Sequence, residues 1–316
     1  MEIRFGYVAI ALNLNNSSTS KTITLKNLEK IAGTEPKLTK LCRITSENLE
    51  NALRVIRYNM EEKIHIYRLT SKLVPFATYP LEFEWNYIDI FKNQLERIGN
   101  LIKTSSIRVS AHPDHFTVIN SPDEKVFNNS VKDLEYHASI FNAMGLEKEH
   151  KLVTHLGGFY GDRNQSIARF KENFLRLPQG VKSRIVLEND DKIYTAKEVL
   201  RVCQELKIPM VFDLHHHTCN PGGQLESLIP KIWSTWTDIR PKIHVSSPKD
   251  QKNYRNHADY VEASSLLNFL SLAKKVNRDF DVMVEAKMKD IAMFNLVRDL
   301  GEYEGITQLD QSTIEI

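Results

Sequence analysis

The sequence predicts a single (β/α)8 TIM barrel, an α/β fold that takes up residues 1–316 as one domain. Eight short runs rich in Val, Ile, Leu and Phe alternate with helical patterns, which is the order of a parallel sheet covered by helices. Six of these runs end in a residue of metal-ligand type. Barrel enzymes carry their active sites at that end of the strands, so the pattern predicts an enzyme.

The expected strands are short because parallel strands are covered on both faces. They lie near residues 3–10, 63–69, 106–112, 151–156, 184–189, 210–215, 241–246 and 281–286. The segments between them carry apolar residues at steps of three and four, which predicts helices at 46–62, 86–103, 130–145, 165–177, 195–207, 224–236, 262–276 and 289–300. A doubly wound open sheet is the alternative. It usually carries a glycine-rich phosphate loop after its first strand, and this chain has none there.

Composition limits the environment and the partners. The net charge of +2 neither requires nor excludes a nucleic-acid partner, so a phosphate-binding surface would have to be local. Three cysteines (Cys42, Cys203 and Cys219) are too few and too widely spaced for a disulfide framework, so we expect a reducing, cytoplasmic environment. The N-terminal run FGYVAIAL is expected to be the first strand rather than a secretion signal. No window is long enough to span a membrane.

Eight candidate metal ligands stand at, or just beyond, the downstream ends of the apolar runs. They are His112, His155, Glu188, Asp213, His216, His244, His257 and Glu285. Imidazole and carboxylate ligands without thiolate suit Zn²⁺, Mn²⁺ or Fe²⁺. Eight ligands exceed the need of one ion, which indicates a cluster of two or three divalent ions, an arrangement suited to cutting phosphodiesters. A single His at a strand end is more often a hydrogen-bonded structural residue than a metal ligand. Structural roles that arose independently would not place eight such residues at the same end of the barrel.

Lys242 lies two residues before His244, so strand alternation places both side chains on the same face. A lysine inside a barrel is costly unless it is neutralised. The amine could pair with an acidic neighbour, or it could be carboxylated and become a metal-type ligand. The residues alone favour the ion pair.

Three rim segments are candidates for contact with a nucleic acid. Lys249, Lys252 and Arg255 form a local basic segment after the seventh strand that can contact phosphates, or that is simply a solvated loop. His115 and Phe116 follow the third strand and can stack on or wedge between bases, or anchor their own loop. Tyr7, near the end of the first strand, is the third candidate.

The combined motifs resemble the ultraviolet-damage endonuclease family, whose members are relatives of endonuclease IV. The motifs are RFGY, YRLTSKLVP, VSAHPDHF, VTHLGG, LENDD, FDLHHH, PKIHVSS with NHADYV, and VMVEAK, in order from residue 4 to residue 287. The resemblance implies a barrel with a three-metal, manganese-type site, Zn²⁺ being the alternative. It also implies a monomer that cuts damaged double-stranded DNA immediately 5′ to a lesion, leaving a 3′-hydroxyl and a 5′-phosphate. The implied lesions are cyclobutane dimers, 6-4 photoproducts and abasic sites.

Carried over residue by residue, the resemblance makes all eight candidates metal ligands, with Glu188 as a bridging carboxylate. It makes Glu188, Glu285 and Lys242 catalytic and places Lys242 where the family has a carboxylated lysine, against the preference for an ion pair. His115 and Phe116 stand where some relatives have a Gln-Tyr pair. Arg255 stands where endonuclease IV usually has Asp, which favours the ultraviolet-damage branch.

Three other functions stay open from the sequence. The nearest is an abasic-site endonuclease of the endonuclease IV type. A metal-dependent sugar isomerase or epimerase barrel usually has fewer ligands. A damage-sensing DNA-binding protein with a structural metal does not account for so many ligands on one rim.

Overall fold

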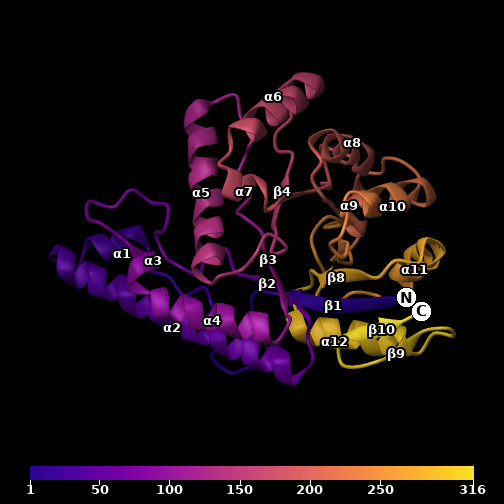
Figure 1. The fold of residues 1–316 in the computed structure, drawn as a ribbon, viewed down its shortest axis with the longest axis horizontal. Coiled ribbons are helices and arrows are strands. Elements are labelled where there is room, and N and C mark those ends of the chain that lie inside the picture. Colours follow the sequence, from indigo (N-terminus) through magenta and orange to yellow (C-terminus); the bar gives the residue numbers. More distant parts are fainter.

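The computed structural model describes residues 1–316 and shows a closed barrel of eight parallel strands (Figure 1). The strands are β1 (Glu2–Val8), β2 (Ile66–Leu69), β3 (Arg108–Ala111), β4 (Leu152–His155), β5 (Ile185–Glu188), β6 (Met210–Asp213), β7 (Lys242–Val245) and β8 (Phe280–Val284). Each pairs in parallel with the next, and β1 pairs with both β2 and β8. This closure confirms the predicted barrel and excludes the doubly wound sheet.

Helices surround the barrel and fill every crossover between strands. The long ones are α2 (Thr34–Glu61), α4 (Lys92–Thr104), α5 (Glu124–Ala143), α6 (Arg163–Arg176), α8 (Ala196–Leu206), α10 (Leu225–Ser234), α11 (Ser264–Val276) and α12 (Lys289–Leu300). Each of them overlaps one predicted helix. Short helices add to them: α1 (Leu25–Glu29), α3 (Tyr87–Ile90), α7 (Gln179–Lys182) and α9 (Leu214–Cys219). None of the helices is both long enough and apolar enough to cross a bilayer.

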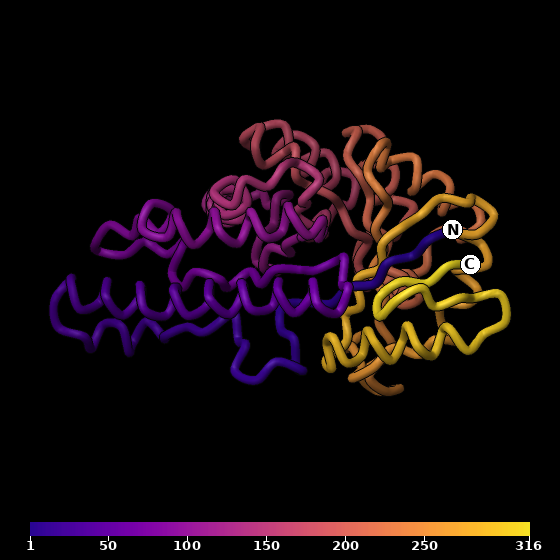
Figure 2. Tube along the Cα trace, turned by 60° about the horizontal axis from the view of Figure 1, so that its bottom comes forward, coloured from indigo at the N-terminus to yellow at the C-terminus, as the bar shows by residue number.

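Helix α2 begins twelve residues before the predicted start at Ser46, at Thr34. Its first buried residue is Leu41, so the first turns carry no buried apolar stripe and gave no periodic signal. This exposed part extends beyond the barrel beside α1 and α3, at the left of Figures 1 and 2.

A C-terminal hairpin that the sequence pattern did not predict extends the sheet. Strands β9 (Thr307–Gln308) and β10 (Thr313–Glu315) are antiparallel, and β10 also pairs with the first residues of β1. The pairing brings the two ends of the chain together (Figure 2), and the Met1 amino group donates to the Ile316 carbonyl at 3.0 Å. Both strands are too short to show an alternating pattern.

The apolar core lies mainly between the strands and the helices, in one contiguous cluster. The lumen of the barrel is different. On one side, Val153, Val186 and Val211 pack with Trp236 in a small apolar cluster. Next to this cluster the base of the lumen is charged, because Arg4 and Arg108 both donate to the fully buried Asp281, at 2.9 and 2.7 Å, and the Arg108 guanidinium lies 5.1 Å from the centroid of the Trp236 ring. Barrel interiors are more often filled by branched aliphatic side chains.

Candidate active site

All eight predicted ligands lie at the carboxyl ends of the strands or in the segments that directly follow them, His216 in the short helix α9. Strand register sets two of the neighbour relationships, since His155 pairs with Glu188 and Asp213 pairs with His244. Glu188, Asp213 and His244 are almost fully buried, whereas His112, His155 and His257 are partly exposed. The site is therefore open at its outer edge and enclosed toward the lumen.

Glu188 is the centre of the cluster, because both of its oxygens face imidazoles. Nδ1 of His244 lies 2.7 Å from Oε1, and Nδ1 of His216 lies 3.7 Å from the same oxygen. Nε2 of His112 and Nε2 of His155 lie 3.3 and 3.7 Å from Oε2. Burial opposes ionisation of this carboxyl, but the imidazole of His244 and hydrogen bonds from His112 and His244 hold its pKa well below the usual range.

The donor atoms fall into two groups that share Glu188. One group is His112, His155 and Glu188, and the other is Glu188, Asp213, His244 and Glu285; within each group the donor atoms lie within 4.8 Å of one another. His257 borders the second group, with Nδ1 3.8 Å from Oε2 of Glu285. A carboxylate common to both groups has the geometry of a bridging ligand.

Oδ2 of Asp213 is buried in the cluster without a hydrogen-bond partner. Burial raises the pKa of Asp213 to about 8 and lowers the pKa of His244 to about 4. Polar groups buried in this state are costly, and a coordinated cation would satisfy them. The residues present therefore fit a cluster of divalent ions.

The His-rich segment after β6 forms the short helix α9. Asp213 caps it, because Oδ1 accepts the backbone N–H of His216 at 2.7 Å. Nδ1 of His216 lies 2.9 Å from the Asn189 carbonyl, so its N–H donates there and Nε2 is left free as a ligand atom. His215 is buried beside Cys219, with 3.7 Å between Nε2 and Sγ.

Arg68 is a residue of the site that sequence reasoning missed. It belongs to β2, and its Nη1 lies 2.6 Å from Oε1 of Glu285 while Nη2 lies 2.7 Å from Nε2 of His244. Burial opposes ionisation of Glu285, but this guanidinium holds the pKa of the carboxyl below its usual range. An arginine inside the apolar run IYRL was the available signal, overlooked because arginine is not a metal ligand.

Lys242 and His244 both face the lumen, as strand alternation predicted, but the ion pair favoured by the residues alone is absent. The Nζ of Lys242 donates to Ser110 Oγ at 3.2 Å and pairs with no carboxylate. Burial lowers the pKa of this amine well below its usual range, and the positive charge of Arg108 lowers it further, more than Asp281 raises it. Burial therefore favours the neutral form of this amine.

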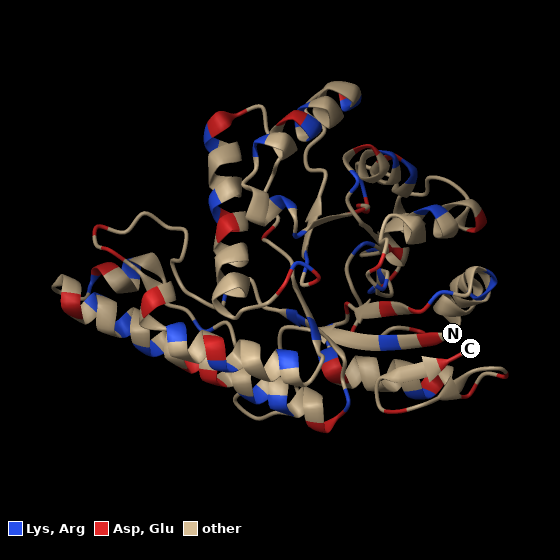
Figure 3. Cartoon of the chain, in the orientation of Figure 1, with Lys and Arg blue, Asp and Glu red and all other residues tan.

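Of the residues predicted to contact DNA, one is buried and the others are exposed. The expectation for Tyr7 is wrong, because the side chain is fully buried and its hydroxyl donates to Asn59 Oδ1 at 2.7 Å. The other candidates are exposed on the rim loops: His115, Phe116, Lys249, Lys252 and Arg255. Phe116 is 73% exposed, and its ring centroid lies 3.9 Å from that of His115. Basic and acidic residues are mixed along the helices (Figure 3), so the basic loop is a local feature.

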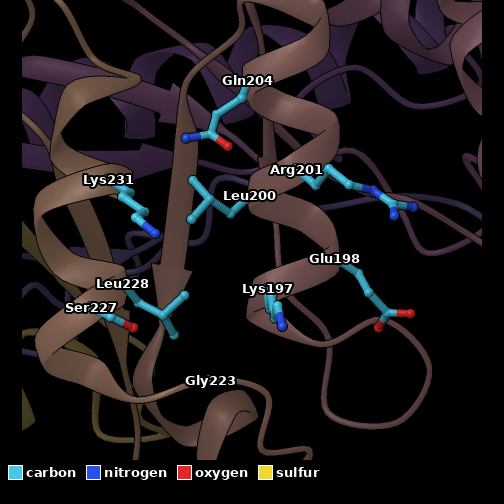
Figure 4. Close-up of a pocket in the computed structure, with 9 residues that line it drawn as sticks. All are labelled: Lys197, Glu198, Leu200, Arg201, Gln204, Gly223, Ser227, Leu228 and Lys231. Atoms are coloured by element: carbon cyan, nitrogen blue, oxygen red, sulfur yellow. The ribbon is translucent and has the colours of Figure 1, made fainter.

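A cavity lies away from this cluster. It has a volume of about 630 Å³, is bordered by α8 and α10, and is lined by residues such as Lys197, Arg201 and Lys231 (Figure 4). It contains no histidine and none of the eight ligands. A smaller pocket of about 400 Å³ adjoins the cluster and is lined by His112, His155 and His115. The candidate site is therefore identified by its metal-ligand side chains and not by the volume of its pocket.

Comparison with known proteins places the chain in one family. The model of the family described as UV-endonuclease UvdE matches residues 3–316. The UV DNA damage endonuclease of Bacillus mycoides (strain KBAB4) is 42% identical over 318 residues, covering 100% of both chains. The crystal structure of SacUVDE is 32% identical with a TM-score of 0.83, over 95% of this chain and 98% of that one.

Endonuclease IV from Thermus thermophilus has a TM-score of 0.54 at 13% identity, with 95% of this chain and 100% of that one covered, so it shares the fold. The family model and the near relatives span the whole barrel, including all eight ligand positions. The chain therefore belongs to the UvdE family of UV endonucleases.

Proposed function

We propose that this protein is a metal-dependent DNA repair endonuclease that cuts the backbone immediately 5′ to ultraviolet photoproducts. The products are a 3′-hydroxyl and a 5′-phosphate, and the lesions are cyclobutane dimers, 6-4 photoproducts and abasic sites. The observation that carries the proposal is the ring of four imidazoles around the Glu188 carboxylate, with a buried oxygen of Asp213 that lacks a partner. Membership of the UvdE family supports DNA as the substrate.

The eight ligands would hold two or three divalent ions, for which we propose Mn²⁺. Such ions activate water and neutralise the charge on a phosphate when they are bound. The residues fix where this happens: Glu188 joins the two donor groups, and the hydrogen bond from His216 to Asn189 orients its ring. The enclosed inner side excludes bulk water, whereas the exposed edges of His112, His155 and His257 leave the site open to a backbone phosphate.

Lys242 supports a further part of the proposal, namely carboxylation of its amine. A neutral amine is the reactive form toward carbon dioxide, and burial next to Arg108 favours this form by lowering the pKa of Lys242. The carboxylate formed in this way would lie among the arginines of the lumen, which would stabilise its negative charge. Lys242 would then act with Glu188 and Glu285 as part of the catalytic machinery.

The exposed rim residues supply the proposed contacts with DNA. Lys249, Lys252 and Arg255 lie on one loop, where they can neutralise backbone phosphates. Arg255 also pairs with Asp191, with 3.6 Å between Nε and Oδ2, which positions it on the rim. Phe116 presents an apolar ring that can enter a base step weakened by damage.

The test is a gel assay on an end-labelled duplex with one defined cyclobutane dimer, incubated with manganese-loaded protein. We expect one product, cut immediately 5′ to the dimer, and no cutting of the undamaged duplex. Cutting of an abasic duplex alone would favour the abasic-site endonuclease instead. Absence of cutting with any divalent ion would contradict both nuclease functions.

A further inference from the structure

The loop that follows β4 presents two aromatic side chains that the proposed chemistry does not use. Phe159 and Tyr160 are 43% and 45% exposed, although large apolar rings are usually buried. They come four and five residues after the ligand His155. The rim therefore has a second aromatic pair in addition to His115 and Phe116.

The backbone of this loop is held rigidly. The fully buried side chain of Asn120 accepts the Gly158 N–H at 2.9 Å and donates to the Gly158 carbonyl at 2.7 Å. The Tyr194 hydroxyl donates to the same carbonyl at 3.0 Å. Since the backbone is fixed from below, the exposed rings are presented at defined positions.

Tyr160 adopts a backbone conformation that is rare for a bulky residue, with φ of 49°. Its ring lies against Gly158, because a Cβ built on that glycine would be 2.6 Å from the ring. The guanidinium of Arg169 lies 5.7 Å from the ring centroid. A left-handed conformation in a non-glycine residue costs free energy and persists where the surroundings enforce it, often at functional sites.

Gly158 also lines the pocket of about 400 Å³ that contains the ligands His112 and His155. His115 lines the same pocket, and its ring centroid lies 3.9 Å from that of Phe116. The Tyr160 ring therefore packs against one residue of the pocket wall, Gly158, and the His115 and Phe116 loop supplies another part of that wall.

Away from His112 and His155, the lining of this pocket carries more carboxylates than cations, which favours a neutral group there over a phosphate. Asp190 and Asp191 both line it, and Lys192 is its one lysine or arginine. Asp190 accepts the backbone N–H groups of Lys192 and Tyr194, and Asp191 pairs with Arg255. A nucleobase meets these conditions, since it is uncharged, polar at its edge and flat.

We propose that Tyr160 is a base-stacking residue, which packs its exposed ring against a base that has lost its neighbour in the damaged duplex. This inference rests on the proposed function and adds a specificity-determining residue to it. Every base has a π-face, so a stacking contact recognises loss of base stacking rather than sequence. Such a contact suits an enzyme that must accept chemically different lesions.

The test compares variants in a Glu188→Gln background, in which the DNA is expected to be bound but not cut. Affinity is measured by fluorescence anisotropy for a duplex with one cyclobutane dimer and for the undamaged duplex. Truncation of a base-stacking side chain weakens binding by about 5- to 150-fold. We expect a loss of this size for Tyr160→Ala on the dimer duplex, and much less on undamaged DNA.

Two matched variants complete the design. Tyr160→Phe keeps the ring and is expected to bind within about twofold of the parent. Leu175→Ala removes a side chain that is 66% exposed on α6 and should also bind like the parent. Parental affinity of Tyr160→Ala for the dimer duplex, or an equal loss on undamaged DNA, would overturn the proposal.

If the parent itself does not prefer the dimer duplex, the proposed function fails. The variants are then compared on a single-stranded oligonucleotide, whose bases are already accessible. Equal affinity of the parent and Tyr160→Ala in that assay would overturn the stacking role on its own.

Discussion

The guanidinium of Arg68 lies 2.6 Å from a carboxylate oxygen of Glu285, so that a buried cation from β2 contacts a ligand at the end of β8. The same guanidinium reaches His244. Arg68 thereby supplies positive charge next to a carboxylate of the candidate site.

We expect Arg68→Met to destabilise the protein in the presence of a chelator by about 3–5 kcal/mol, because Glu285 is left as a buried charge without its partner. Manganese should restore part of this loss, since a cation can replace the guanidinium. The measurement is urea unfolding with EDTA and with manganese. As a control, Arg97→Met removes an exposed arginine. Equal stability of variant and parent in EDTA would show that Arg68 does not neutralise Glu285.

Glu188→Gln is expected to abolish incision while binding of dimer-containing DNA largely survives. Loss of an outer partner of a metal ligand typically costs 10- to 100-fold in activity, and loss of a carboxylate shared by both donor groups should cost more. Incision is followed on the gel and metal content by atomic emission. Glu172→Gln, on the exposed face of α6, is the control. Turnover like that of the parent would remove Glu188 from the metal site.

Carboxylation of Lys242 predicts a carbamate signal in the ¹³C NMR spectrum of protein equilibrated with ¹³C-bicarbonate. The signal should be missing in Lys242→Arg, whose side chain has similar length but no reactive amine. A spectrum of the parent without this signal would mean that the buried amine stays unmodified and bonded to Ser110.

Stability should fall in acid, partly because of His150. Burial lowers the pKa of this imidazole to about 4, from its ordinary value of 6.5. The unfolded chain therefore binds more protons than the folded one between these values, so His150 contributes stability above pH 6.5 that is lost as pH falls to about 4. A shift of this size corresponds to roughly 3 kcal/mol. Urea unfolding of the parent and His150→Gln at about pH 7 and about pH 4.5 should show a smaller loss in the variant; equal losses would contradict this role.

The sequence was sufficient for the barrel and for the ligand cluster, because both depend on repeated patterns. Glu188 and His244 stand at the downstream ends of strands with clear apolar runs, and parallel strands bring these ends to one rim. Arg68 was missed because its partners, Glu285 and His244, come from the β8 and β7 side of the barrel. No local sequence pattern reports which strands the closed barrel brings near β2.

Tyr7 shows the opposite error. Its place near a strand end suggested that the side chain is exposed. In the structure the ring lies beside Tyr67 and α2, and Asn59 accepts a hydrogen bond from its hydroxyl group. Strand position defines the end of the barrel on which a residue lies. Only packing decides whether the side chain reaches solvent.

The hydrogen bond between Met1 and Ile316 has a practical consequence. Both ends of the chain emerge where β1 begins and β10 ends, at the pole of the barrel opposite the ligand rim. A fluorophore or surface tether at either terminus would leave the DNA-facing pole unobstructed. The adjacent ends also make the chain suitable for circular permutation, in which a short linker joins the ends and new termini open in a helix-connecting loop.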